Sequence, residues 1–455
     1  MTLKKTSANG IIKGGVIIAL GGLISKVLGA VYRIPLTNIL GGEGLGIYQT
    51  AFPIYCLLLT FSSTGAPSAI AKLVASDNDK GKAVLRRALT VFAPLGLFGS
   101  LFMAVLSPVI SRLQGNPDAY AVYIALSPSV FLVSVISCVR GYFQGKKNMS
   151  PTAVSQVIEQ AVKLSVGLFL CYYFANTPKR GATFATLAVS ISEGVALLYL
   201  LLLKKKDKRE ERPYRYSARI IVANVIPIAF STLLLPLARV YDSFTVINYL
   251  KSYMTNAVSL YGVYTGGVET VIGLPVSVCY GLAVASLPTV SALVGKGETE
   301  KAHEKASFSI GLTLLVSSVF AFIIFFFSGF IVNTVFKGLS QSERLITSSL
   351  LKSSAVNVIL LSLVQTETSC LIALGKNYAP CVFLGFGLLA KIIIQPILLS
   401  VRSVNIFAPL ISDILCYSLA VFGNLVYIII CKGKVNENNA YRNRNNGRRF
   451  ISRGV

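Results

Sequence analysis

Residues 24–55 read ISKVLGAVYRIPLTNILGGEGLGIYQTAFPIY. This stretch contains the end of one apolar segment, a glycine-rich break and the start of a second apolar segment. Lys26 and Arg33 are seven positions apart in the first segment, so they lie two helical turns apart on one face. A charged side chain at bilayer depth is costly and usually faces a water-filled cavity or a partner. The stretch therefore predicts membrane-spanning helices that carry functional cations.

Apolar runs of similar length cover most of the 455 residues. The chain is 54% hydrophobic and 13% charged, with a mean hydropathy of +0.67, which is high for a soluble domain. A run of about 20 residues crosses a bilayer as a helix. Twelve runs are predicted, within a range of eleven to fourteen, because prolines interrupt the seventh and eighth. We expect the spans near residues 11–32, 45–66, 88–111, 120–141, 152–175, 182–203, 220–249, 258–290, 307–333, 346–373, 378–400 and 405–431.

Basic residues are distributed unevenly between the predicted loops. Of the 43 Lys and Arg residues, 30 lie in the two terminal segments and the loops of one side, and 7 lie in the loops of the other side. An excess of Lys and Arg marks cytoplasmic loops. A multi-pass protein of the cell membrane is predicted, with both termini and residues 72–87, 140–147 and 204–219 cytoplasmic, and residues 34–44 and 334–345 external. The net charge of +25 reflects this topology and attraction to anionic lipid, and no nucleic-acid partner is expected.

The second half of the chain repeats the order of polar markers in the first half. Gly46-Ile47-Tyr48 opens the second span, much as Gly262-Val263-Tyr264 opens the eighth. Equivalent spans are six apart, an even number, so the halves have the same orientation and form parallel repeats. Chance similarity between apolar segments is the alternative. The predicted fold is an all-α polytopic membrane protein of about twelve helices in two six-helix lobes around a central cavity.

The predicted domains follow from the basic segment at the middle of the chain. Residues 204–219 read KKKDKREERPYRYSAR and form a cytoplasmic linker between an amino-terminal lobe, 1–203, and a carboxy-terminal lobe, 220–431. Residues 432–455 are rich in Asn and Arg and have almost no apolar content. They are expected to form a disordered, basic cytoplasmic tail.

Three basic residues in the predicted spans are candidates for substrate binding. Lys26, Arg33 and Arg239 supply charge-assisted hydrogen-bond donors for an anionic headgroup such as a pyrophosphate. For Arg33 an alternative is open, because it lies near the outer end of its span and can extend to the membrane interface. All three lie in spans that are expected to line the cavity.

Four other charged residues are candidates for coupling or gating. Asp242 is three positions after Arg239 on a proline-bent helix, and Glu269 is either a titrating acid or the partner of a basic residue. Glu159 and Lys163 are four positions apart with the acid first, which favours an intrahelical ion pair and leaves a gating role as the alternative. The sequence does not decide between these interpretations.

No pattern of residues indicates an enzyme, a metal site or a cofactor. The 8 cysteines form no CxxC motif and are expected to be small, buried apolar residues. The single histidine, His303, lies in the charged segment GKGETEKAHEK and is expected to be solvated. There is no phosphate-binding loop for ATP. No catalytic residue is therefore assigned.

The first 75 residues resemble a known superfamily. Ser25-Lys26-Val27-Leu28-Gly29 is similar to an element of the lipid II flippases in which an arginine takes the place of Lys26, and Thr64-Gly65-Ala66-Pro67-Ser68 resembles the sporulation branch. The chain thus resembles the multidrug/oligosaccharidyl-lipid/polysaccharide flippase superfamily, in the branch of stage V sporulation protein B and the lipid II flippases. One departure is that lipid II flippases place further arginines in the second and eighth spans, where this chain has none and Glu269, respectively.

This resemblance implies a fold similar to that of the multidrug exporters and a function as a flippase. The implied substrate is an undecaprenyl-pyrophosphate-linked cell-wall precursor, lipid II, in the synthesis of spore cortex peptidoglycan. Its implied partners are the lipid-linked oligosaccharide, membrane lipids and cell-wall synthesis proteins. Three alternatives are open: a flippase for another polyprenyl-linked oligosaccharide, a cation-coupled multidrug antiporter, and a non-transporting scaffold of wall synthesis. An antiporter would favour acids over Lys26 on the first helix, and a scaffold would tolerate loss of the charges.

Overall fold

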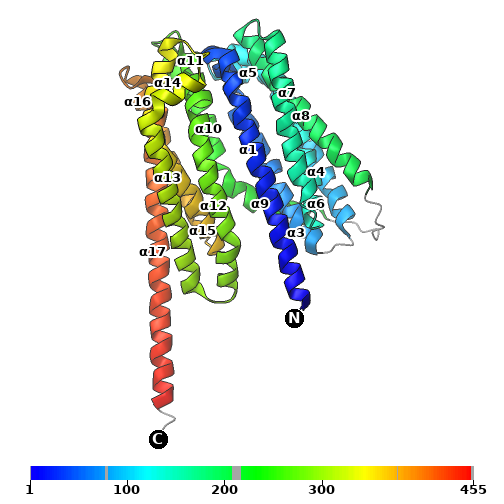
Figure 1. Cartoon of the computed structure of the whole chain (residues 1–455), viewed down its shortest axis with the longest axis vertical. Helices are drawn as coiled ribbons and strands as arrows, with labels where there is room; N and C mark the ends of the chain where they lie inside the picture. Colours follow the sequence, from blue (N-terminus) through cyan, green and yellow to red (C-terminus); the bar gives the residue numbers. More distant parts are fainter. Residues whose placement is uncertain (1, 77–79, 207–216, 377, 452–455) are drawn as a thin grey trace. The chain divides into compact units, whose positions relative to one another are not determined.

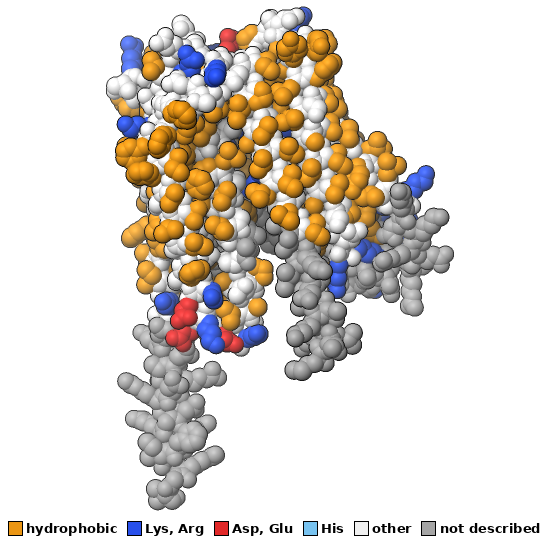
Figure 2. Space-filling model, viewed as in Figure 1, with side chains coloured by type: hydrophobic (Ala, Val, Ile, Leu, Met, Phe, Trp, Pro, Cys, Tyr) orange, Lys and Arg blue, Asp and Glu red, His pale blue; other side chains and the backbone are white. Residues whose placement is uncertain are grey.

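The regular structure of the chain is helical throughout the residues that the structure, a computed structural model, describes: 2–76, 80–206, 217–376 and 378–451. Ten helical stretches in this part are long and apolar enough to cross a membrane. In hydrocarbon, a helix satisfies its backbone polar groups internally, so long apolar runs fold in this way. Figure 2 shows hydrophobic side chains along the helices and charged ones near their ends, as lipid contact requires. The predicted all-α polytopic fold is confirmed.

The helices pack into two compact units, which are described separately below. The first unit contains Met1–Thr270, Gly329–Ser348 and Leu399–Ile406, and the second contains Val271–Ser328, Ser349–Leu398 and Phe407–Val455. These boundaries are drawn by packing. The predicted division into six-helix lobes at residues 204–219, and the cavity between those lobes, stay predictions.

The first unit begins with the long helix α1 and contains most of the helices of the amino-terminal half. Within it, α1 packs against α7, α8 and α11, and α4 packs against α6. Its core includes Tyr32, Tyr48, Tyr55 and Tyr123. Its elements are α1 (Thr2–Thr50), α2 (Phe52–Leu59), η1 (Thr60–Gly65), α3 (Ala66–Ser76), α4 (Gly81–Val105), α5 (Ser107–Leu113), η3 (Pro117–Ala119), α6 (Tyr120–Gly145), α7 (Ser150–Phe174), α8 (Pro178–Lys206), α9 (Ala218–Thr232), α10 (Leu234–Lys251), α11 (Ala257–Gly262) and η4 (Val263–Val268).

The glycine-rich break between the first two predicted spans is a sharp turn within α1 (Figure 1). Residues 34–44 were expected to form a loop, but only Gly41 departs from helical geometry there, with φ 64° and ψ −175°. Residues other than glycine rarely adopt this conformation, so a single glycine can join two helical arms. The prediction of an extended loop over residues 34–44 is therefore wrong. The external position of this turn stays a prediction.

Residues that are equivalent in the two predicted repeats lie against each other in the first unit. A Cβ atom on Gly262 would lie 2.3 Å from the backbone nitrogen of Gly46, so the two helices approach to backbone contact at this pair. Close to it, the Gln49 amide donates to the Thr265 carbonyl at 3.3 Å. Both pairs are 216 positions apart. Contact between equivalent residues is what parallel repeats produce next to their symmetry axis.

The second unit is built mainly from five long helices of the carboxy-terminal half, α12, α13, α15, α16 and α17. Within it, α15 packs against α17, and Lys391 of α16 forms an ion pair with Asp413 of α17 at 2.5 Å. Both side chains are nearly inaccessible, with exposed fractions of 1% and 7%. The remaining elements of the chain, several of which cross between units, are α12 (Glu269–Gly295), α13 (Thr299–Val335), α14 (Gln341–Ser353), α15 (Ala355–Ala373), α16 (Ala379–Ser400), η5 (Asn405–Phe407) and α17 (Ala408–Ile451).

One expectation for this half differs from the structure. His303 is 4% exposed rather than solvated, because it lies near the start of α13 and shares the buried face of that helix with Ala302 and Ala306. The backbone of α17 is helical to Ile451. The disordered, basic tail that the sequence predicts over residues 432–455 stays a prediction.

The cysteines lie as predicted for the most part. Five of the eight are buried, and all eight are free thiols. Cys56 is the exception that is exposed.

Candidate functional site

Two arginines that are far apart in the sequence bind adjacent residues at the start of α12. The Arg33 guanidinium, on α1, donates to the Thr270 hydroxyl at 2.5 Å. The Arg239 guanidinium, on α10, forms an ion pair with the Glu269 carboxylate at 2.9 Å. Because Glu269 and Thr270 are consecutive, both guanidinium groups are held in one region of the first unit. We call Arg33, Arg239, Glu269 and Thr270 the arginine cluster.

The members of the arginine cluster differ in how accessible they are. The Arg239 side chain is 54% exposed, whereas that of Glu269 is 17% exposed. Arg33 is half-buried. Glu269 was expected to be either a titrating acid or a partner of a basic residue, and in this structure it is the partner of Arg239. Asp242, one turn along α10 from Arg239, is buried.

Lys26 is exposed on α1, two turns before Arg33. This part of α1 packs closely on α7, because a Cβ atom on Gly21 would lie 2.6 Å from the Ala153 Cβ. At Gly29 the nearest atom to such a Cβ would be the Gln160 side-chain oxygen, at 3.3 Å. The glycines thus set the distance between the helix that carries Lys26 and the helix that carries Glu159 and Lys163.

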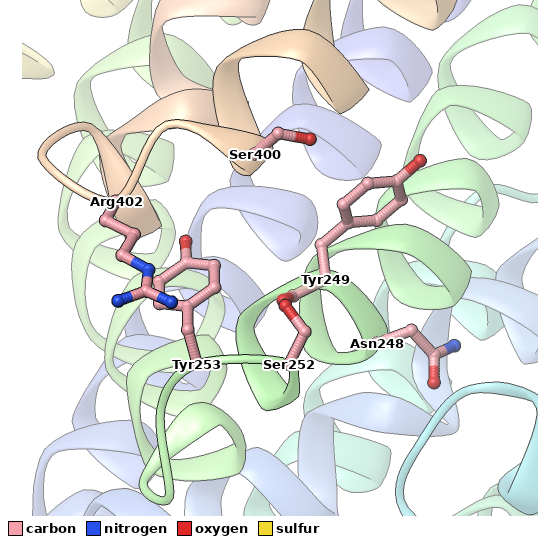
Figure 3. A pocket seen from close by; sticks show the side chains of 6 residues that line it. All are labelled: Asn248, Tyr249, Ser252, Tyr253, Ser400 and Arg402. Atoms are coloured by element: carbon pink, nitrogen blue, oxygen red, sulfur yellow. The ribbon is translucent and has the colours of Figure 1, made fainter.

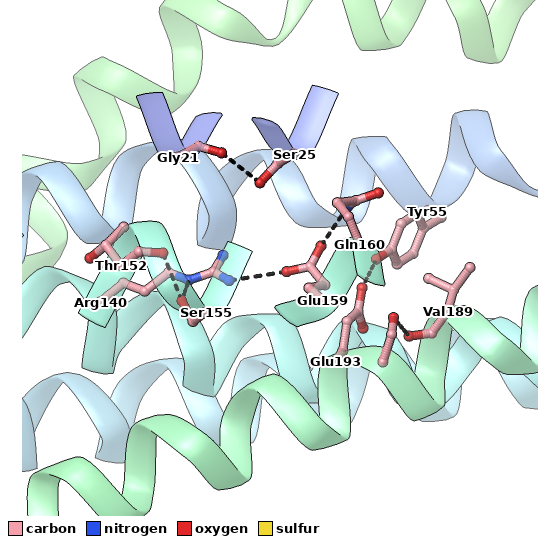
Figure 4. A network of polar contacts seen from close by, with 11 residues as sticks. Gly21, Ser25, Tyr55, Arg140, Thr152, Ser155, Glu159, Gln160, Val189 and Glu193 are labelled. Atoms are coloured by element: carbon pink, nitrogen blue, oxygen red, sulfur yellow. Dashed lines mark hydrogen bonds and ion pairs between the residues drawn. The ribbon is translucent and has the colours of Figure 1, made fainter. Parts of the chain in front are cut away.

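Glu159 belongs to a second polar group, which lies between α6 and α7 (Figure 4). Its carboxylate accepts from the Arg140 guanidinium at 3.0 Å and from the Gln160 amide at 3.2 Å. Arg140 also donates to the Ser155 hydroxyl at 2.9 Å. The local pair of Glu159 with Lys163 that the spacing favours is therefore replaced by a pair between helices. Lys163 instead lies with its Nζ atom 5.7 Å from the centre of the Tyr32 ring.

A buried carboxylate lies close to this group on α8. The Tyr55 hydroxyl donates to one oxygen of Glu193 at 2.7 Å (Figure 4). The other oxygen of Glu193 has no hydrogen-bond partner among the described residues. A buried acid with a half-satisfied carboxyl group is costly unless it is protonated or shares a neighbouring charge.

A match to a family sequence model identifies the family of the chain. The sequence model of the family described as "Polysaccharide biosynthesis protein" matches residues 11–294, which is more than half of the chain. The chain belongs to this family. The match covers the arginine cluster and the second polar group, so both lie in the part of the chain that defines the family.

Two relatives of this family member come from Bacillus subtilis (strain 168). Stage V sporulation protein B is 28% identical over 337 residues, which cover 70% of the chain and 65% of that relative. Lipid II flippase MurJ is 25% identical over 452 residues, which cover 92% of the chain and 81% of that relative. The aligned part of the chain thus spans slightly less than two thirds of the sporulation protein. The resemblance stated from the sequence motifs is confirmed.

The fold of the chain matches that of a solved transporter. An inward-facing conformation of a multidrug resistance MATE family transporter of the MOP superfamily matches with a TM-score of 0.78 and 15% identity. The match covers 91% of the chain and 96% of that structure. At this identity the likeness establishes the fold alone, and it confirms the predicted MATE-like architecture.

The sequence missed some of the partners in these groups but identified five of their charged residues as candidates: Arg33, Arg239, Glu269, Glu159 and Lys163. Arg140 was assigned to a basic cytoplasmic segment, although it lies inside α6 and its side chain is 15% exposed. The signal was available, because α6 and α7 form a hairpin with a short turn, which places residues at comparable distances from the turn side by side. Thr270 carries no charge, so nothing in the sequence pointed to it.

Proposed function

We propose that this protein is a flippase that moves an undecaprenyl-pyrophosphate-linked cell-wall precursor, lipid II, across the cytoplasmic membrane. The observation that carries the proposal is the arginine cluster, in which Arg33 on α1 and Arg239 on α10 bind consecutive residues of α12. Family membership supports transport rather than enzymatic chemistry. The similarity to lipid II flippase MurJ supports lipid II as the substrate, and the similarity to stage V sporulation protein B supports a role in sporulation.

The chemistry of a pyrophosphate fits the donors of this region. Arginine presents parallel N–H groups that match phosphate oxygens, and the bonds are stronger than neutral hydrogen bonds. A pyrophosphate cannot cross hydrocarbon as an isolated anion, because the loss of hydration is too costly. In the proposed mechanism the headgroup passes along these donors by alternating access, while the undecaprenyl tail stays in lipid.

Glu269 has a defined role in this mechanism. It neutralises Arg239 when no substrate is bound, and the incoming pyrophosphate replaces it. Lys26, exposed on the same helix as Arg33, is the first cation that a headgroup meets from the cytoplasmic side of the predicted topology. The second polar group, with Glu159, Lys163 and Arg140, connects α6 and α7 and is assigned a gating role.

The test is translocation of labelled lipid II by purified protein in reconstituted vesicles. Lys26→Ala and Arg33→Ala are expected to abolish translocation while leaving the amount of folded protein near normal. Lys26→Arg is expected to keep much of the activity, because it preserves the charge and the donors, and Lys26→Glu to lose it. Arg112→Ala is the matched control, because Arg112 is an exposed arginine on α5, outside both polar groups.

Two outcomes would count against the proposal. Full translocation by a stably folded Lys26→Glu, Arg33→Ala double variant would refute the role of the cations. Equal loss of folded protein and of activity would mean that both residues only stabilise the first helix. A panel of other polyprenyl-linked oligosaccharides and cationic drugs in the same vesicles separates lipid II from the alternative substrates, and a scaffold would translocate none of them.

A further inference from the structure

A pocket of about 480 Å³ opens at the end of α10 in the first unit (Figure 3). It is separate from the arginine cluster, since its residues come from the last turns of α10, the following turn, the last residue of α16 and the loop after α16. Pockets of 300–1,000 Å³ are of the size that holds small ligands. The side chains that line the pocket are Asn248, Tyr249, Ser252, Tyr253, Ser400 and Arg402.

The two walls of the pocket are joined by hydrogen bonds. The Tyr253 hydroxyl donates to the Leu399 carbonyl at 2.9 Å, which connects the turn after α10 to the end of α16. The loop that follows is closed by backbone bonds from Val404 and Asn405 to the Val401 carbonyl, at 3.0 and 3.2 Å. Arg402 is therefore carried on a tight turn rather than on a long loop.

Arg402 places a positive charge at the mouth of this pocket. Its guanidinium is exposed and has no hydrogen-bond or ion-pair partner within the part of the chain that the structure describes. Burial raises the pKa of the Tyr253 phenol, and the charge of Arg402 offsets part of that increase, so the two groups are close. Figure 3 shows Arg402 and Tyr253 on one side and Tyr249 on the other, with Ser252 and Ser400 between them.

We infer that this pocket binds an anionic sugar. Arg402 would pair with a phosphate or carboxylate group, as guanidinium groups do with planar or tetrahedral oxyanions. The faces of Tyr249 and Tyr253 offer apolar surface with polar edges, which suits a sugar ring. Ser252 and Ser400 supply hydroxyl groups that can accept or donate to the sugar hydroxyls. The combination of one cation, two phenols and small polar groups fits an acidic sugar better than a cationic or purely apolar ligand.

The position of the pocket indicates when such a sugar would bind. The loop with Arg402 belongs to the predicted external side, so the pocket would meet a sugar that has crossed the membrane or that is already part of the wall. The identity of the sugar and the side of the membrane on which it binds rest on the proposed function and its topology. The ability of the pocket to bind an anionic sugar is argued from the residues that line it. It would serve as a second site, which receives the headgroup after it leaves the arginine cluster.

Binding can be measured directly because the chain contains no tryptophan. In Tyr249→Trp, a single indole in the pocket reports occupancy by its fluorescence, in full-length protein in lipid nanodiscs. The probes are N-acetylglucosamine 1-phosphate and neutral N-acetylglucosamine. We expect a saturable change with the phosphate, weakened about ten- to hundred-fold by Arg402→Ala and less by Arg402→Lys. Arg344→Ala, at a partly exposed arginine that donates to the Lys337 carbonyl, is the control and should bind as the parent does.

Several outcomes would overturn the inference. They are equal binding of the neutral sugar, unchanged affinity after Arg402→Ala, and the absence of saturable binding at millimolar phosphate sugar. If the Tyr249→Trp substitution itself prevents binding, saturation-transfer NMR with the same probes measures binding to the unsubstituted protein and tests the same outcomes. The Arg402 variants must keep the melting temperature of the parent for the comparison to hold.

The two sources of an anionic sugar, and the two proposals, are separated by further arms of this experiment. If the ligand is the lipid-linked headgroup, lipid II in the nanodiscs should compete with N-acetylglucosamine 1-phosphate for the pocket. If the ligand is the wall polymer, soluble wall fragments should compete instead. The Lys26→Ala, Arg33→Ala double variant should bind the probe although it does not flip. Flipping by the unsubstituted protein without probe binding would refute only this inference, and probe binding without flipping would refute only the proposed function.

Discussion

The buried ion pair of Lys391 and Asp413 gives the sharpest prediction for stability. The pair joins α16 to α17 at 2.5 Å, and its exposed fractions are 1% and 7%. A hydrogen bond from the Ser412 hydroxyl to the Gln395 side-chain oxygen, at 2.8 Å, joins the same helices beside it. Lys391→Met keeps most of the apolar side-chain volume but removes the charge. It leaves Asp413 inside the protein without its ion-pair partner.

The size of the loss follows from measured cases of the same kind. Breaking one side of a buried ion pair costs about 3–5 kcal/mol. For a unit of this size, a shift of about 2–4 °C per kcal/mol gives a fall in melting temperature on the order of 10 °C.

The assay is thermal unfolding followed with a thiol-reactive dye, since Cys370 and Cys416 are buried free thiols of the same unit. Lys391→Met with Asp413→Leu should recover most of the loss, because no buried charge is left. A single variant that melts within about 2 °C of the parent, or a double variant no better than the single, would refute the reasoning.

Two further predictions concern packing and topology. Gly262→Ala should cost roughly 1–3 kcal/mol of stability by overpacking, because its Cβ would lie 2.3 Å from a backbone nitrogen of α1. Gly273→Ala is the control and should be neutral, because the position has open space around it. Thermal melting of both variants checks this prediction, and equal melting temperatures would contradict it. A cysteine at Lys206, in a cysteine-free background, should resist an impermeant thiol reagent in intact cells because the basic segment is predicted to be cytoplasmic; external labelling would invert the topology.

The sequence was informative where the signal was local or periodic. The apolar runs predicted the spanning helices, because a helix in lipid needs only its own length and hydrophobicity. The motif around Lys26 and Arg33 gave the family and two of the candidate cations. The local pattern gave the wrong partner for Glu159, because the i, i+4 spacing favoured Lys163 and an arginine on the neighbouring helix competed with it.

Other features could not be obtained from residue types. Whether His303 is solvated depends on where α13 begins, which places its side chain on the buried face of a helix rather than in a loop. The pocket at Arg402 combines residues that are about 150 positions apart and have unremarkable local patterns. Such groupings are products of the tertiary fold, and a single sequence contains no signal for them.

Two ion pairs in this chain differ in how accessible they are, and the proposed mechanism depends on this difference. The Lys391–Asp413 pair is almost inaccessible, so separating it costs about 4 kcal/mol and it stays closed. The Arg239–Glu269 pair is joined at a similar distance, but the arginine is 54% exposed, and a pair of this kind is worth only about 0–1 kcal/mol. A hydrogen bond from arginine to a charged phosphate contributes about 1.5–3 kcal/mol. In the proposed mechanism the pyrophosphate can therefore take Arg239 from Glu269 with a net gain, whereas no anion could take Lys391 from Asp413. In the proposed mechanism, accessibility, rather than the presence of a charge in a span, is what distinguishes the arginine cluster as the site that binds the pyrophosphate.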